Sequence, residues 1–128
     1  MTAESVASPD DRPVVRARDQ AAWHAWLEAN SLQARGAWLV FYKKGTGAPS
    51  VNYEQAVDEA VAYGWIDSRS NRVDDARYIQ LFTPRRPGSA WSRSNKDRAQ
   101  RLLAAGLMAP AGLAAVEEAK RRGAWDAL

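Results

Sequence analysis

Four segments of the chain carry apolar residues at intervals of three and four positions, which is the spacing of one face of an α-helix. They span residues 18–30, 52–63, 92–105 and 110–122. Polar caps or a proline stand at the starts of the last three segments, and glycines follow the ends of these three. These residues are Asn52 with Gln55, Ser92 or Ser94, and Pro110 at the starts, and Gly64, Gly106 and Gly123 at the ends. The pattern predicts four helices.

Strand patterns follow the first helix and separate the second from the third. Residues 37–42 are apolar at every position, as in a strand that is buried on both faces. Residues 65–73 and 77–83 have the pattern of a β-hairpin turned around residues 74–76. We therefore expect an α+β domain with a small three-stranded sheet, made of the β-hairpin and one central strand and packed with four helices. The expected order is α-β-α-β-β-α-α.

The length of 128 residues fits one domain, and the composition of 46% apolar and 26% charged residues is that of an ordinary globular protein. Residues 1–15 are small, polar and without periodicity, so we expect a disordered N-terminal tail. Residues 16–128 are expected to form the single folded domain.

The first strand of the hairpin is polar on both faces, unlike its apolar partner. Such a strand is either a solvated edge strand or the wall of a site. Asp67 follows Trp65 by two residues and should therefore share its face. An aspartate beside a large ring either pairs with an arginine or becomes an acid of raised pKa, so Asp67 is the one candidate catalytic residue.

A second group of candidates surrounds two adjacent arginines, Arg85 and Arg86, which lie between Pro84 and Pro87. Prolines hold the backbone stiffly, so these cations can bind an anion at low entropic cost. Hydroxyl and amide side chains then follow at a helix N-terminus, which favours an anion, and a tryptophan offers a flat surface. The candidate ligand-binding residues are Trp65, Asp67, Arg85, Arg86, Ser89, Trp91, Ser92 and Asn95.

Positive charge is concentrated in one part of the chain. The net charge is +3, and the stretch from Trp65 to Arg101 holds nine basic and four acidic residues. With tryptophan and tyrosine interleaved, this stretch is also typical of nucleic-acid binding. A third interpretation is architectural, with arginines and tryptophans that lock the loop to the core.

Several kinds of chemistry are disfavoured by composition. The chain contains no cysteine, and its one histidine, His24, lies on the first helix, so a thiol site, a histidine zinc site and a Ser/His/Asp triad are not expected. No cofactor is expected. Acidic residues occupy the N-terminal region and no apolar run is long enough to span a bilayer, so we expect a cytoplasmic protein without membrane association. We expect a monomer or a weak homodimer.

The motifs, taken in order, resemble the bacterial YdeI/OmpD-associated family, whose members are called bacteriocin-protection proteins. They are Trp23-x-x-Trp-Leu27, Gly36-x-Trp-Leu39, Lys43-Lys-Gly45, Tyr53-x-x-Ala-Val57, Tyr63-Gly-Trp-Ile-Asp67, Phe82-Thr-Pro-Arg-Arg-Pro87, Trp91-Ser92, Asn95 and Pro110-Ala-Gly112. The resemblance implies a role in antimicrobial tolerance or stress, and it supplies no reaction or substrate. Ser68 stands where the family pattern has glycine, and the chain resembles a short form without the C-terminal extension of many relatives.

These observations lead to one main hypothesis and, besides the architectural interpretation, two alternatives. The main one is a binding domain in which Arg85 and Arg86 hold an anionic small molecule, Trp65 and Trp91 pack its ring, and Asp67 orients an arginine. Ser92 and Asn95 would add hydrogen bonds. The alternatives are a nucleic-acid-binding protein that uses the basic segment 69–101, and an enzyme with Asp67 as general acid or base.

Overall fold

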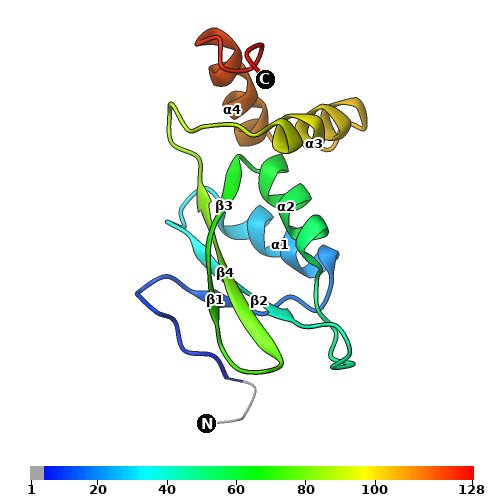
Figure 1. Cartoon of the computed structure of the whole chain (residues 1–128). Coiled ribbons are helices and arrows are strands. Elements are labelled where there is room, and N and C mark those ends of the chain that lie inside the picture. The colour runs from blue at the N-terminus through cyan, green and yellow to red at the C-terminus, as the bar shows by residue number, and fades with distance from the viewer. Residues whose placement is uncertain (1–4) are drawn as a thin grey trace.

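The computed structural model describes residues 5–128, which form four strands and four helices in the order β1-α1-β2-α2-β3-β4-α3-α4 (Figure 1). The strands are β1 (Val14–Val15), β2 (Ala37–Tyr42), β3 (Trp65–Arg72) and β4 (Arg77–Pro84). The helices are α1 (Gln20–Asn30), α2 (Tyr53–Ala62), α3 (Arg93–Ala104) and α4 (Pro110–Arg121). The α+β class and the four helices are confirmed.

The expected three-stranded sheet is wrong, because a fourth strand, β1, comes from the segment that we assigned to the tail. The sheet has the order β1-β2-β4-β3 and is mixed. β1 runs parallel to β2, with Val14 opposite Trp38, and the Trp38 N–H donates to the Pro13 carbonyl at 2.8 Å. Two residues have no periodicity of their own, so only the pairing with β2 makes them a strand. The first four residues of the predicted tail lie outside the described part.

The hairpin partner β4 lies between β2 and β3, which leaves β3 at the edge. The register shifts between Asp67 and Ser70: these two residues are three apart, whereas their partners Phe82 and Gln80 are two apart. The extra residue is a β-bulge. It breaks the strict alternation expected for this strand, and Arg69 lies on the opposite face from Trp65, over the ring of Trp38.

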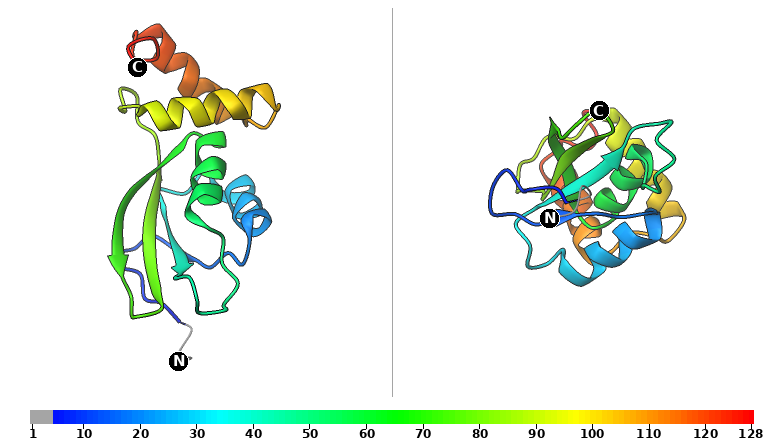
Figure 2. Two further views of the ribbon diagram at one scale, coloured as in Figure 1. Left: turned by 45° about the vertical axis from the view of Figure 1, so that its right-hand side comes forward. Right: turned by 90° about the horizontal axis from the view of Figure 1, so that it is seen from below.

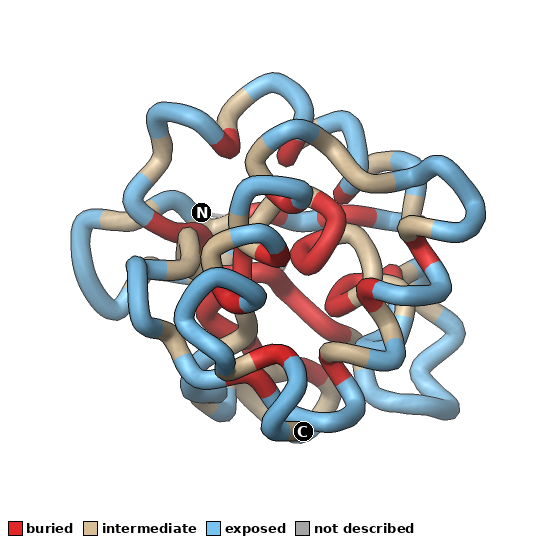
Figure 3. The backbone as a smooth tube through the Cα atoms, turned by 90° about the horizontal axis from the view of Figure 1, so that it is seen from above, coloured by how far each residue is buried: buried red, intermediate tan, exposed pale blue. Residues whose placement is uncertain are grey.

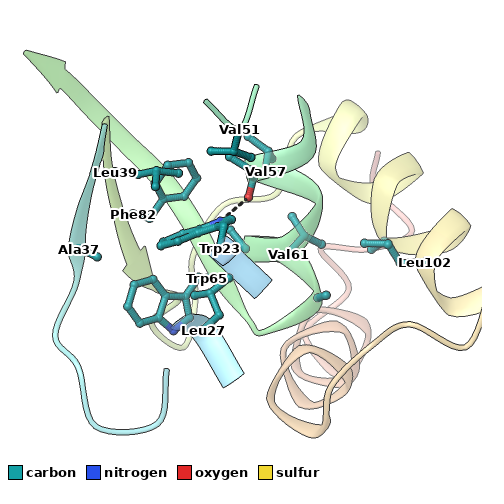
Figure 4. Close-up of a cluster of buried hydrophobic side chains, with 14 of the residues drawn as sticks. Trp23, Leu27, Ala37, Leu39, Val51, Val57, Val61, Trp65, Phe82 and Leu102 are labelled. Carbon is teal, nitrogen blue, oxygen red and sulfur yellow. Dashed lines mark hydrogen bonds between the residues drawn. The ribbon is translucent and has the colours of Figure 1, made fainter. Parts of the chain in front are cut away.

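Helices α1 and α2 cover one face of the sheet, and the main core lies between them and the strands (Figures 1 and 4). Trp23 is fully buried there, and its indole N–H donates to the Ala56 carbonyl at 3.0 Å. Figure 3 shows the buried residues gathered at the centre of the fold. A smaller apolar cluster occupies the other face of the sheet, around Trp38 and Leu81, against which the N-terminal Val6 and Val14 pack.

Helices α3 and α4 stack beyond one end of the sheet, away from the N-terminal segment (Figure 2). A close backbone contact places α4: the Ala109 N–H donates to the Ala62 carbonyl at 2.9 Å. A Cβ on Gly112 would stand 2.2 Å from that same oxygen, so only glycine fits there. Gly64, at φ 75°, ends α2 in the left-handed conformation beside the Ala111 carbonyl. Within residues 5–128, no helix has the length and apolar character needed to cross a membrane.

Candidate functional site

The two arginines lie in a closed turn at the end of β4, which we call the arginine turn (residues 84–89). The Arg86 N–H donates to the Ser89 hydroxyl at 2.9 Å, and the Ser89 N–H donates to the Arg86 carbonyl at 2.9 Å. The Arg85 N–H donates to the Gly64 carbonyl at 2.9 Å, which ties the start of the turn to the end of α2. The backbone is therefore held by hydrogen bonds as well as by its prolines.

Helix α4 holds the arginine turn from the other side. The Glu118 carboxylate accepts a hydrogen bond from the Gly88 N–H at 3.0 Å, and Arg122 donates to the Ser89 carbonyl at 2.5 Å. Arg122 also pairs with Glu118 at 3.0 Å. The Gly88 N–H and Arg122 together lower the pKa of Glu118, so this carboxylate is ionised at neutral pH.

A mainly apolar hollow of about 370 Å³ lies between the arginine turn and α4, and we call it the apolar cavity. Its volume is near the lower end of the range for small-molecule pockets. The apolar part of its wall includes Leu32, Trp65, Trp91, Ala111, Ala114 and Ala115. Arg85, Arg86 and Glu118 are the charged residues in the wall. Leu32 is 85% exposed, so one side chain at this cavity is apolar and open to solvent.

A second hollow of about 650 Å³ lies on the face of the sheet that the helices leave uncovered, and we call it the arginine cleft. Five arginines line it, and no aspartate or glutamate does so within the described residues. They are Arg12, Arg35, Arg69, Arg85 and Arg86. The arginine turn forms a wall common to the apolar cavity and the arginine cleft. The residues that line both are Pro84, Arg85, Arg86, Pro87 and Ser89.

Arg85 is the most constrained cation of the site. Its guanidinium carbon lies 3.7 Å from the centroid of the Trp91 ring, and its Nη1 donates to the Ala90 carbonyl at 3.1 Å. Its Nε and Nη2 are buried, yet no residue from 5 to 128 offers either atom a hydrogen-bond acceptor. Burial lowers the pKa of Arg85 to about 10, although the charge of Asp67 acts in the opposite direction.

Nε and Nη2 form one edge of the guanidinium, and the N–H groups on this edge can donate together to a carboxylate. Two other arginines use this edge in that way: Arg77 bonds to the Asp74 carboxylate at 3.1 and 2.8 Å, and Arg12 bonds to that of Asp10 at 3.1 and 2.5 Å. On Arg85 the same edge has no carboxylate from the described chain. The remaining buried donor without an acceptor, Nε of Arg98, belongs to a cation that already pairs with Glu54 and Asp58.

The structure brings five of the eight predicted ligand-binding residues together: Trp65, Arg85, Arg86, Ser89 and Trp91 all line the apolar cavity. Ser92 and Asn95 line neither hollow. The Ser92 hydroxyl instead accepts the Asn95 N–H at 3.1 Å as the N-cap of α3, and Asn95 is buried. Capping satisfies an otherwise unpaired N–H group, so this hydroxyl has a structural partner.

Asp67 also lies outside both hollows. It accepts a hydrogen bond from the Tyr53 hydroxyl at 2.6 Å and forms no ion pair with an arginine in the part of the chain that is described. The expected Asp67–arginine pair is therefore wrong. The physical reason is that Tyr53, the first residue of α2, reaches the carboxylate on the helix-covered side of β3. Burial and then this hydrogen bond raise the pKa of Tyr53 to about 12.

Sequence reasoning missed residues that come from distant parts of the chain. Arg12 and Arg35 precede the basic stretch. Glu118 lies on α4, and Arg122 is the C-cap residue of that helix. Arg69 belongs to the basic stretch, but strict alternation from Trp65 predicts the other face of its strand. None of these residues carries a local signal, because the tertiary fold alone brings them to the turn.

The described residues contain no group of three histidine or acidic side chains arranged to hold a metal ion. A family model described as a domain of unknown function, DUF8412, matches residues 15–115. The chain belongs to this family. No curated protein and no solved structure matches the chain. Arg69, Arg85 and Arg86 lie inside the matched part of the DUF8412 domain, whereas Arg12, Glu118 and Arg122 lie outside it.

Proposed function

We propose that this domain binds a small anionic compound with an apolar ring, which occupies the apolar cavity and sets its negative group against the arginine turn. The single observation that carries the proposal is the Nε–Nη2 edge of Arg85, buried and without an acceptor from residues 5–128. A buried donor without a partner costs about 1–3 kcal/mol, and more when it is charged. An anion that accepts from both atoms would remove this cost.

The geometry also supports a particular anion. Two parallel N–H groups on one edge match the two oxygens of a carboxylate or a phosphate. Arg86 lines the same cavity, is exposed, and forms no ion pair within the described residues, so it can add a second charge contact. Trp65 and the alanines of α4 contribute an apolar wall for the ring.

Binding should involve a local shift of the arginine turn. Nε and Nη2 of Arg85 are closed off from solvent, so an anion reaches them only if the side chain or the rim of the turn moves. Complexes that need such a change associate more slowly than preformed ones. The hydrogen bonds from α4 to Gly88 and Ser89 limit how far the turn can move.

Nucleic-acid binding receives less support from the charges. Five of the nine basic residues between Trp65 and Arg101 form ion pairs, namely Arg72, Arg77, Arg93, Arg98 and Arg101. These pairs neutralise much of the basic stretch before any phosphate could approach. The catalytic hypothesis for Asp67 is also weakened, since Asp67 lines neither hollow.

The proposal is tested by calorimetry and thermal shift with benzoate, indole-3-carboxylate and phenyl phosphate. We expect at least one of them to bind, and expect Arg85→Gln and Arg86→Gln each to weaken its affinity by about tenfold. Arg93→Gln is the matched control, because Arg93 is exposed on α3, away from both hollows, and loses the same charge. Absence of binding by all three compounds, or an equal loss in Arg93→Gln, would contradict the proposal.

The biological role remains a prediction from the sequence. Resemblance to the YdeI/OmpD-associated family motivates a part in bacteriocin protection or stress response, and the binding of a small ring-bearing anion is compatible with such a role. A deletion strain complemented with wild type or with Arg85→Gln would test it. Equal tolerance of bacteriocins in both strains would show that the biological role does not depend on anion binding by Arg85.

A further inference from the structure

We propose that the arginine cleft is a second anion site, which holds a phosphate group between Arg69 and Arg86. This site lies on the opposite side of the arginine turn from the apolar cavity and does not require the cavity to be occupied. The phosphate could be free or part of a larger ligand, because the chemistry that recognises it is the same.

The β-bulge in β3 supplies the first part of this site. Strict alternation from Trp65 would have placed Arg69 on the face that the helices cover. The extra residue between Asp67 and Ser70 places Arg69 in the cleft instead, beside Ser68, which alternation already puts on that face. Bulges commonly aim a side chain in this way next to functional sites.

The guanidinium of Arg69 is held in place by an aromatic ring, but no acidic side chain of the described residues neutralises its charge. Its central carbon lies 5.3 Å from the centroid of the Trp38 ring, a cation–π contact that limits its movement. Trp38 is itself fully buried, and its indole N–H donates to the Asp10 carboxylate at 3.2 Å, so the platform beneath Arg69 is fixed. No acidic residue from 5 to 128 pairs with Arg69.

The other arginines of the cleft divide into paired and unpaired ones. Arg12 pairs with Asp10 at 2.5 Å, and Arg35 pairs with Asp11 at 2.6 Å. Arg86, like Arg69, has no acidic partner among the described residues. The free positive charge of the cleft is therefore concentrated on Arg69 and Arg86, together with the half-buried Arg85 that it shares with the cavity.

The remaining side chains of the cleft suit a phosphate better than a ring-bearing acid or a nucleic-acid strand. Ser68, Thr83 and Ser89 bring three hydroxyl groups to it, which can donate hydrogen bonds to phosphate oxygens. Single-stranded nucleic acids need exposed aromatic rings on which bases stack, and no aromatic residue lines the cleft in the described chain. The aromatic side chains Trp65 and Trp91 line the apolar cavity and not the cleft.

The experiment measures pyrophosphate binding to the full chain by isothermal titration calorimetry at low salt. We expect binding to the wild-type protein, and we expect Arg69→Gln and Arg86→Gln each to weaken it by about tenfold, as loss of a charge-assisted contact predicts. Both positions are exposed, so the variants should fold, which thermal melting will verify. Arg72→Gln is the matched control, since it removes the same charge from the same strand, outside the cleft.

A cavity variant separates this proposal from the proposed function. Ala114 is exposed on α4 and lines only the cavity, so Ala114→Phe should abolish the binding of ring-bearing anions and leave the pyrophosphate affinity unchanged. Arg69→Gln should have the reverse effect. The second site is overturned if pyrophosphate does not bind, if Arg72→Gln weakens binding as much as Arg69→Gln, or if Ala114→Phe abolishes it.

Discussion

The guanidinium carbon of Arg85 lies over the Trp91 ring, 3.7 Å from the ring centroid, while one edge of the cation has no acceptor from the described chain. One face of the cation is thus satisfied by the protein, and one edge is left for a ligand. A purely architectural arginine would be expected to have that edge paired, as Arg77 does with Asp74.

Arg85→Met separates binding from architecture. Replacing an incompletely paired buried charge with an apolar side chain of similar size is often neutral or stabilising, so we expect the free energy of unfolding to stay the same or rise by about 1 kcal/mol. Anion binding should be lost. Denaturant unfolding and calorimetry measure the two effects. A fall in stability of more than about 2 kcal/mol would favour the architectural interpretation.

Ser92→Ala tests whether Ser92 is a cap or a ligand contact. Because its hydroxyl caps α3, its loss should lower the free energy of unfolding by about 1 kcal/mol. The affinity for a ring-bearing anion should not change, since Ser92 lies outside the cavity. Ser94→Ala is the control: the Ser94 hydroxyl contacts that of Ser92 at 3.1 Å but caps no backbone N–H, so its loss should lower the stability less than Ser92→Ala and leave the affinity unchanged. A loss of affinity in Ser92→Ala at unchanged stability would restore Ser92 as a ligand contact.

Tyr53→Phe tests the hydrogen bond to Asp67 through its pH dependence. Burial and then the hydrogen bond to Asp67 raise the pKa of Tyr53 from 10.0 to about 12, so the tyrosine stays protonated in the folded protein while it ionises in the unfolded chain. Its contribution is therefore complete below pH 10 and is lost as the pH rises to about 12. At pH 7 wild type should be more stable than Tyr53→Phe by about 1 kcal/mol. Denaturant unfolding from pH 8 to 12 should show this difference shrink, whereas a constant difference would contradict the assignment.

Gly112→Ala tests how α4 is placed beside the cavity. Alanine favours an isolated helix over glycine by about 1 kcal/mol. Here the new Cβ would stand 2.2 Å from the Ala62 carbonyl oxygen, and we expect this clash to lower the free energy of unfolding by about 2 kcal/mol. Thermal and chemical unfolding measure the change. Gly45→Ala is a control for steric contact, because a Cβ there meets nothing within 4 Å, although its φ of 89° adds backbone strain. Equal stability of Gly112→Ala and wild type would show that α4 moves freely.

The local elements followed from the sequence where the signal was local. The capping box of Asn52 and Gln55 starts α2, and residues 37–42 form the buried strand as expected. The observed sheet differs from the expected one because of how the strands pair. β1 exists because Val14 and Val15 lie against β2, and the bulge after Asp67 arises from the register with β4. Neither the short strand nor the bulge is visible in the composition or the residue spacing of its own segment.

The sequence alone determined the four helices, the hairpin and a stiff arginine pair between two prolines, because spacing, caps and proline geometry act over a few residues. The tertiary structure decided which hollows these two arginines line. It packs α4 against the arginine turn and places Arg69 on the opposite face of β3 from Trp65. It also pairs Asp67 with the Tyr53 hydroxyl rather than with an arginine. These outcomes depend on contacts between residues far apart in the chain, whose geometry is set only when the sheet and the helices pack together.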